Sequence, residues 1–334
     1  MITSIESYYS NEWKLKCSPD TSFLSSWQGL SLFSHSLLIF FLPMHALTIH
    51  CIFNKTPKTM DSVKWVIFNT HCWCCYVDIL VCSLITPYFF FPTLSGFPVG
   101  LFRVLGIPTS AQLYIGMVSC MVMGISIIAL FENRSSCIQN NRFKITKIGT
   151  KVVYYFLNCI PIVGYLIPPF FHIPDQNAAK LNLLQTIPCP TEEFFYSEIF
   201  VLATDDFWHT YLWMFTTIIV IGIFIQVAFF FLCCLYYIYF STTITLSPKT
   251  KKYQRTFFLG TIAQALVPLI FLLAPAALVF LSIFFNYYDQ SLNNFIVLFI
   301  SFHDFVSTFI IILIHHPYRQ FLIQVATFDK VHRK

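Results

Sequence analysis

Seven long apolar stretches contain none of the chain's twenty Lys and Arg residues. A hydrocarbon core about 30 Å thick takes roughly 20 helical residues to cross, and each stretch reaches that length. A backbone in lipid must satisfy its own hydrogen bonds, so each stretch is expected to be a helix. The sequence therefore predicts an all-α membrane protein, a bundle of seven transmembrane helices. The predicted spans are Leu30–Phe53, Val66–Phe91, Ile107–Phe131, Val152–Phe171, Tyr211–Phe240, Phe257–Phe285 and Leu292–Ile314.

The basic residues fall mainly in alternate connections between these stretches. Sixteen of the twenty lie after the first, third and fifth stretches and in the carboxyl-terminal tail. Cytoplasmic loops of membrane proteins carry the excess of Lys and Arg, so the amino terminus is expected outside the cell and the carboxyl terminus inside. Residues 1–29 would then be extracellular, 30–314 would form the bundle, and 315–334 would form a cytoplasmic tail.

The composition excludes several classes of function. Hydrophobic residues make up 57% of the chain and charged residues only 10%, against about 25% charged in soluble domains. The net charge of +5 is spread over short loops as a topology signal, so the bilayer rather than nucleic acid is the expected partner. The chain contains no nucleophile motif, phosphate-binding loop, dinucleotide fingerprint or pair of catalytic acids. We therefore do not expect an enzyme.

Only two of the twelve cysteines, Cys17 and Cys189, fall in predicted extracellular segments. Disulfides persist in oxidising compartments, whereas intramembrane and cytoplasmic cysteines are usually buried or reduced. By elimination, the favoured disulfide joins Cys17 to Cys189. The alternative, two free or otherwise engaged thiols, stays open because sequence does not reveal connectivity.

Two further segments carry structural expectations. The longest connection, residues 172–210, lies on the predicted outer side and is expected to form either a lid over a binding cavity or an ordinary solvent loop. In the tail, Phe321, Val325 and Phe328 recur at positions i, i+4 and i+7. This spacing predicts a short amphipathic helix on the inner membrane face, with a disordered tail as the alternative.

Charged residues mark the inner end of the third stretch, where Glu132, Asn133 and Arg134 follow one another. A carboxylate beside this Arg is expected to form a charge pair that holds the inner end of the bundle closed. Movement of the sixth helix would then release Arg134 toward a partner protein. The alternative is that the tripeptide only anchors the helix at the interface.

The only acids inside the predicted spans are Asp78 and Asp304. Intramembrane carboxylates are costly and usually face the bundle interior. His71 lies on the same face of the second helix as Asp78, and His303 adjoins Asp304 in the seventh. We expect these four residues to form a polar cluster, with a sodium ion or water near Asp78 as an option. No transition-metal site is expected, because no ligand spacing of the soluble type occurs. The simpler alternative is interhelical hydrogen bonding that sets packing.

Polar and aromatic residues at the upper ends of the third and fifth helices are candidates for a small-molecule cavity. They are Gln112, Tyr114, Trp208, His209, Tyr211 and Trp213. Such cavities have apolar walls and few polar anchors. For the aromatic residues, an interfacial belt at the membrane surface is the stronger alternative.

Several ordered motifs run from the first inner loop to the tail. They include Asn54-Lys55-Thr56-Pro57-Lys58-Thr59-Met60, Gly96-Phe97-Pro98, Pro188-Cys189-Pro190 and His316-Pro317-Tyr318-Arg319, with Ser126–Arg134 closing the third helix. Together they are similar to nematode serpentine receptors of class H (Srh) across residues 17–322. The resemblance implies a G-protein-coupled chemoreceptor in the plasma membrane of sensory neurons, sited in their cilia. Its partners would be a small environmental chemical and a heterotrimeric G protein.

The resemblance also suggests coupling residues. Glu132-Asn133-Arg134 stands where other receptor families have Asp-Arg-Tyr, with the Arg displaced by one position, and Pro317-Tyr318-Arg319 stands where they have Asn-Pro-x-x-Tyr. The candidate contacts to a G protein are Glu132, Arg134, Lys251, Lys252, Arg255, Tyr318 and Arg319. The main alternative functions are a ligand-gated channel or transporter and a receptor that no longer signals. Transporters generally show broken helices in repeated halves, which this sequence lacks.

Overall fold

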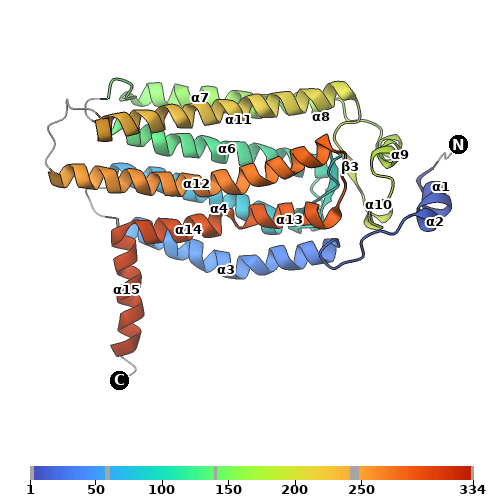
Figure 1. Ribbon diagram of the computed structural model, residues 1–334, viewed down its shortest axis with the longest axis horizontal. Coiled ribbons are helices and arrows are strands. Elements are labelled where there is room, and N and C mark those ends of the chain that lie inside the picture. Colours follow the sequence, from blue (N-terminus) through green and yellow to red (C-terminus); the bar gives the residue numbers. More distant parts are fainter. Residues whose placement is uncertain (1–3, 57–60, 139–140, 241–247, 332–334) are drawn as a thin grey trace.

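Among the residues that the computed structural model describes (4–56, 61–138, 141–240 and 248–331), seven helices are long and apolar enough to cross a membrane. They lie side by side as one bundle (Figure 1). The predicted seven-transmembrane fold is therefore confirmed. The spans are formed by α3 (Trp27–Asn54), α4 (Asp61–Ile79) with η3 (Leu80–Leu84), α6 (Thr109–Ser136), α7 (Ile148–Gly164) with α8 (Ile167–Phe170), α11 (Asp206–Leu235) with η4 (Tyr236–Phe240), α12 (Pro248–Phe284), and α13 (Gln290–Ser301) with α14 (His303–Ile314).

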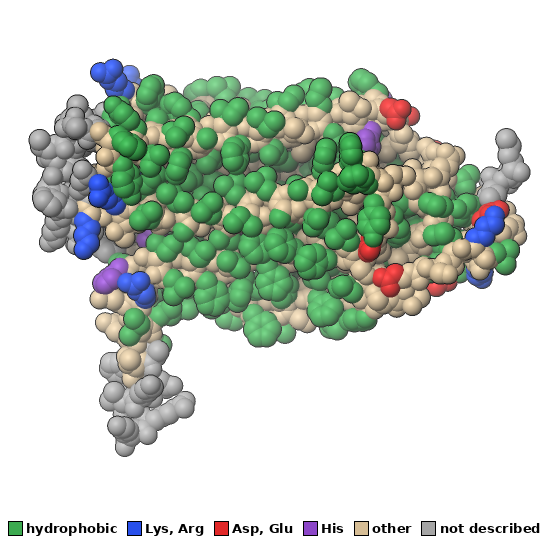
Figure 2. Space-filling view, in the orientation of Figure 1, with side chains coloured by type: hydrophobic (Ala, Val, Ile, Leu, Met, Phe, Trp, Pro, Cys, Tyr) green, Lys and Arg blue, Asp and Glu red, His purple; other side chains and the backbone are tan. Residues whose placement is uncertain are grey.

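Hydrophobic side chains cover the middle of the visible face, as a surface against lipid tails requires (Figure 2). Lys and Arg gather at the end of the bundle that carries the carboxyl-terminal helix, and Asp and Glu lie toward the other end (Figure 2). We call these the inner and the outer end, following the orientation expected from the charge pattern. Within the bundle α6 contacts α4, α7, α11 and α12, so it forms the centre of the packing.

The second span ends earlier than the sequence suggested. We predicted a helix to Phe91, but the helix stops after Leu84 and a strand, β1 (Pro87–Phe89), follows. Thr86 adopts a left-handed φ of 43°, and Pro87 offers no backbone donor, so the helical hydrogen bonding cannot continue. The structure thus adds a small sheet that the all-α prediction did not include.

This sheet lies across the outer end of the bundle. β1 pairs antiparallel with β2 (Ser95–Pro98), which pairs in turn with β3 (Phe200–Val201). Gly96 is required at its position, because a Cβ there would lie 2.5 Å from the carbonyl oxygen of Tyr88. A short helix, α5 (Leu101–Val104), connects β2 to α6.

The long outer connection, residues 172–210, is folded rather than an open solvent loop. It contains α9 (Gln176–Thr186) and α10 (Glu193–Tyr196), which pack with β3 over the sheet. Phe194, Ile187 and Leu183 join Tyr88 and Phe90 in one buried apolar cluster. Burial of each large apolar side chain contributes about 1.5–3 kcal/mol, so this segment forms a stable cap.

The amino-terminal segment fastens onto this cap. It forms α1 (Ile5–Tyr8), η1 (Tyr9–Trp13) and α2 (Lys14–Lys16) beside α10, beyond the outer end of the bundle (Figure 1). The Tyr8 hydroxyl donates to the carbonyl of Pro188 (3.0 Å), and the Trp13 indole N–H donates to that of Pro190 (2.9 Å). Cys17 and Cys189 form a disulfide, the pairing favoured from the sequence.

The tail forms the expected helix, α15 (His316–Val331), which runs across the direction of the spans (Figure 1). Of the three residues in the predicted apolar face, Phe321 packs against His50, with ring centroids 5.5 Å apart. Val325 is 54% exposed, as a side chain facing lipid in this position would be. The side chain of Phe328 lies outside the described residues.

Removal of the Cys17–Cys189 disulfide is expected to destabilise the protein. The bond closes a separation of 172 residues, and loss of a native cross-link typically costs about 2–5 kcal/mol. Cys17→Ser, Cys189→Ser and the double variant should lose equal stability, because each removes the same bond. Thermal unfolding of the purified protein measures the effect, with Cys159→Ser on α7 as a matched control. A double variant much less stable than both single variants would contradict a shared bond.

Candidate functional site

A cavity of about 410 Å³ lies in the outer half of the bundle. Its walls come from the sheet and from α4, α6, α11, α12 and α13, and they are almost wholly apolar. Phe97 and Phe200 contribute from the sheet, Met117 from α6, and Pro275 from the middle of α12. Cavities of this size and character are typical of small-molecule sites.

Two polar side chains in the cavity lining have unused hydrogen-bonding capacity. The side-chain amide of Gln112 on α6 donates to the carbonyl of Ile107 (2.8 Å), but its oxygen has no hydrogen-bond partner among the described residues. The indole N–H of Trp213 on α11 also lacks a partner there. A buried polar atom without a partner costs about 1–3 kcal/mol, so the lining offers one acceptor and one donor to a bound molecule.

Of the six residues predicted to line a cavity, the structure places Gln112 and Trp213 in its wall. Trp208 instead packs on His172, with ring centroids 4.6 Å apart. The Tyr114 hydroxyl instead donates to the carbonyl of Val163 (3.1 Å), and Tyr211 packs on Phe215 with centroids 4.5 Å apart. His209 lies outside the lining. The cavity is deeper than most of the positions considered in the sequence, and on α11 its wall includes Trp213, one turn further in than His209.

Next to the floor of the cavity lies a fully buried polar cluster. Val77 and Ile300 line the cavity, and Asp78 adjoins Val77. Asp78 Oδ1 lies 2.8 Å from Nδ1 of His303, which also lies 2.9 Å from the carbonyl of Ile300. The sodium ion near Asp78 stays a prediction, and an ion there would have to share the carboxylate with His303.

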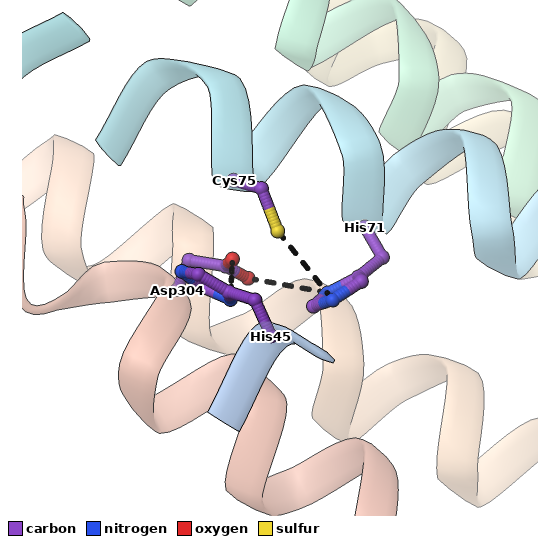
Figure 3. A group of neighbouring side chains, drawn as sticks. All are labelled: His45, His71, Cys75 and Asp304. Atoms are coloured by element: carbon purple, nitrogen blue, oxygen red, sulfur yellow. Dashed lines mark hydrogen bonds and ion pairs between the residues drawn. The ribbon is translucent and has the colours of Figure 1, made fainter. Parts of the chain in front are cut away.

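The second carboxylate of the cluster, Asp304, faces two imidazoles. Its oxygens lie 3.2 Å from Nδ1 of His45 on α3 and 3.8 Å from Nδ1 of His71 on α4, with Cys75 Sγ 3.4 Å from Nε2 of His71 (Figure 3). The four predicted residues thus meet, and His45 is a member that the sequence analysis missed. An imidazole inside the first apolar stretch was the available signal.

The break between α13 and α14 positions the two consecutive residues of the seventh span. α13 ends at Ser301 and α14 begins at His303, so the regular helix is interrupted at Phe302. His303 and Asp304 follow at once, and they pair with Asp78 and with His45 respectively. At this interruption, the adjacent side chains of His303 and Asp304 reach partners on two different helices, α4 and α3.

At the inner end of α6, Glu132 and Arg134 contact different helices. The Glu132 carboxylate accepts from Lys151 Nζ (3.1 Å), the Tyr155 hydroxyl (2.9 Å) and the Ser136 hydroxyl (2.6 Å). The ion pair of Glu132 is therefore with Lys151 of α7, and the charge pair expected between Glu132 and Arg134 is wrong. Residues two apart on a helix do not face each other, which explains the divergence.

The Arg134 guanidinium donates through Nη2 to the carbonyl of Gln254 on α12 (2.9 Å). This bond joins the third and sixth spans at their inner ends. Lys252 is exposed nearby, and the Arg255 guanidinium lies over the Tyr239 ring (4.8 Å to the centroid). The side chain of Lys251 lies outside the described residues.

The two tail residues named as coupling candidates differ in exposure. Tyr318 is fully buried, and its hydroxyl lies 2.6 Å from Oγ1 of Thr56 at the end of α3. Burial raises the pKa of Tyr318, so the phenol remains neutral and fixes α15 to the bundle. Arg319 is exposed, and its guanidinium donates to the carbonyl of Leu313 (3.3 Å).

Comparison with known proteins identifies the family. Residues 25–328 match the family described as serpentine type 7TM GPCR chemoreceptor Srh. The chain belongs to the Srh family. It is also 37% identical over 327 residues to serpentine receptor class H-72 of Caenorhabditis elegans, which covers 98% of this chain and 94% of that protein. No solved structure matches this Srh receptor. The receptor class and the multi-pass membrane location predicted from the sequence are confirmed.

Proposed function

We propose that this Srh receptor binds a small environmental chemical in the cavity beneath the outer sheet and signals to a heterotrimeric G protein. The observation that carries the proposal is the apolar cavity of about 410 Å³, lined by the second, third, fifth, sixth and seventh spans. Family membership supports a chemosensory role. The proposed location is the plasma membrane of a sensory cilium, with the amino terminus outside.

The cavity wall suggests the chemistry of the ligand. Its surface is mostly aliphatic and aromatic, so the ligand would be largely apolar. The free amide oxygen of Gln112 and the free indole N–H of Trp213 would pair with one donor and one acceptor of the ligand. A small alcohol, or a ketone or ester that carries a hydroxyl group, meets these requirements.

Signalling requires that the ligand bind one bundle conformation more tightly than another. Pro275 in the cavity wall and Gln254 at the inner end belong to the same helix, α12. A ligand that repacks the wall near Pro275 would move the inner end of α12 and separate Arg134 from the Gln254 carbonyl. Arg134, Lys252, Arg255 and Arg319 would then be the cationic contacts for the G protein.

The orientation can be tested with epitope tags at each terminus. We expect an amino-terminal tag to bind antibody on intact cells, because the basic loops favour the opposite side of the membrane. A carboxyl-terminal tag should bind antibody only after permeabilisation. The reverse pattern would contradict the G-protein proposal and favour a channel.

Gly116→Leu is expected to reduce the response to ligand by filling the cavity. Gly116 lines the cavity, and a Cβ there would make an ordinary 3.4 Å contact with Ile85, leaving the longer side chain to occupy cavity space. Gly222→Leu on α11 is the control, because its Cβ meets nothing within 4 Å. The measurement is the half-maximal concentration for small alcohols, ketones and esters in cells expressing each variant. Equal responses of Gly116→Leu and wild type would exclude this cavity as the ligand site.

Arg134→Ala should abolish signalling while the surface level stays intact, because it removes the cation that would meet the G protein once α12 has moved away from it. Arg142→Ala, an exposed Arg on the same inner side, is the matched control. Second-messenger output and surface antibody binding are measured together. Normal signalling from Arg134→Ala would remove this residue from the coupling mechanism.

A further inference from the structure

Four potential metal ligands from three different spans meet in the core of the bundle. One donor atom each from His45, His71, Cys75 and Asp304 lies within 4.8 Å of all the others (Figure 3). His45 belongs to α3, His71 and Cys75 to α4, and Asp304 to α14. No transition-metal site was expected from the sequence, because no ligand spacing of the soluble type occurs. His45 and Asp304 lie far from His71 and Cys75 in the chain, and only the fold brings them together.

We propose that His45, His71, Cys75 and Asp304 form a binding site for a zinc ion between the first, second and seventh spans. Two imidazoles, a thiolate and a carboxylate are all common zinc ligands, and structural zinc sites are four-coordinate. His71 and Cys75 are separated by four positions, the spacing by which one helix face presents two ligands to zinc. Sodium, magnesium and calcium prefer oxygen ligands, so this donor set favours a transition metal.

The distances between donors agree with a site that closes on an ion. Tetrahedral bonds of about 2.0–2.3 Å place the ligand atoms roughly 3.3–3.8 Å apart. The close approaches are 3.2 Å between His45 Nδ1 and Asp304 Oδ2, 3.8 Å between His71 Nδ1 and Asp304 Oδ1, and 3.4 Å between Cys75 Sγ and His71 Nε2. With one donor atom from each residue, all four atoms lie within 4.8 Å of one another, so the side chains would have to close further on a bound ion. Such an ion would take one nitrogen of His71 and one oxygen of Asp304.

Hydrogen bonding gives an independent reason for a bound cation. Apart from the ion-pair contacts within the cluster, both ring nitrogens of His45, Nδ1 of His71 and both oxygens of Asp304 are buried without a hydrogen-bond partner among the described residues. Such atoms are costly in a medium that excludes water. A metal ion would use their lone pairs directly.

Charge balance also favours a divalent ion. The Cys75 thiol would release its proton to water on binding, and the thiolate with the Asp304 carboxylate would then neutralise Zn²⁺. The ionised site would carry no net charge, which lowers the cost of burying it between helices. The neighbouring pair, Asp78 and His303, lies 2.8 Å apart and contributes no ligand to the proposed site.

Cobalt binding to the full-length receptor tests the site directly. The receptor, purified without a polyhistidine tag, is placed in lipid nanodiscs, stripped with chelator and titrated with Co²⁺. A tetrahedral site with a thiolate ligand should give visible ligand-field bands and a near-ultraviolet sulfur-to-cobalt band at an equimolar end point. Added Zn²⁺ should remove both and raise the unfolding temperature, because it binds the folded state.

Variants separate this site from adventitious binding. His71→Ala and Asp304→Asn should weaken Zn²⁺ binding by about ten-fold or more, and Cys75→Ser should lose the near-ultraviolet band. Cys72→Ser on the same helix and His50→Ala on α3 are the matched controls, and both should bind as wild type does. Unfolding temperatures in chelator show whether each variant is folded.

Three results would overturn the proposal, and none of them depends on signalling. The first is a failure of the wild-type receptor to bind one equivalent of Zn²⁺. This result would overturn the proposal even if a variant fails to fold. The second is Co²⁺ bands that persist unchanged in Cys75→Ser. The third is an unfolding temperature that changes with pH because of these four residues but does not change when Zn²⁺ is added. A bound proton, and not a metal ion, would then balance the charge of the cluster.

Discussion

Two carboxylates, Asp78 and Asp304, lie fully buried among three imidazoles where the second and seventh spans meet. A charge in the bilayer core is costly unless it is paired, so these contacts restrict how α3, α4 and α14 can be arranged. Sliding one span past another by a turn would leave a carboxylate or an imidazole without its partner. The register of the first, second and seventh spans therefore depends on this cluster.

The outer end of the bundle is held by different forces. Here water is available, and the chain uses a three-stranded sheet, an apolar cluster around Tyr88 and Phe194, and the Cys17–Cys189 disulfide. These contacts join the amino terminus to the long outer connection and close the cavity from above. A molecule that reaches the cavity must pass this cap or enter between spans from the lipid.

The sequence predicted what depends on composition and helical spacing, and it missed what depends on contacts between distant segments. The apolar runs and the charges of the loops predicted the seven spans. The Cys17–Cys189 disulfide was predicted because the other cysteines were excluded. The strand that begins at Pro87 lies within an apolar run, so the prediction from hydropathy extended the helix through these residues. His45 could be assigned to the cluster only once α3 was placed against Asp304. Gln112 and Trp213 were among the six candidates for the cavity wall, but the sequence did not separate them from the other four, because cavity depth is a tertiary property.

The cavity, the polar cluster and the Arg134–Gln254 hydrogen bond at the inner end follow one another along the bundle. Ile300 lines the cavity, and its carbonyl contacts the His303 ring that pairs with Asp78. The seventh span is interrupted at Phe302, between Ile300 and Asp304, so its two halves can change their relative direction without loss of a long run of helical hydrogen bonds. A shift of α13 at the cavity would therefore act first on the contacts of the buried carboxylates. α14 packs against α12, the helix that Arg134 holds at the inner end, so the same shift has a physical route to the proposed G-protein surface.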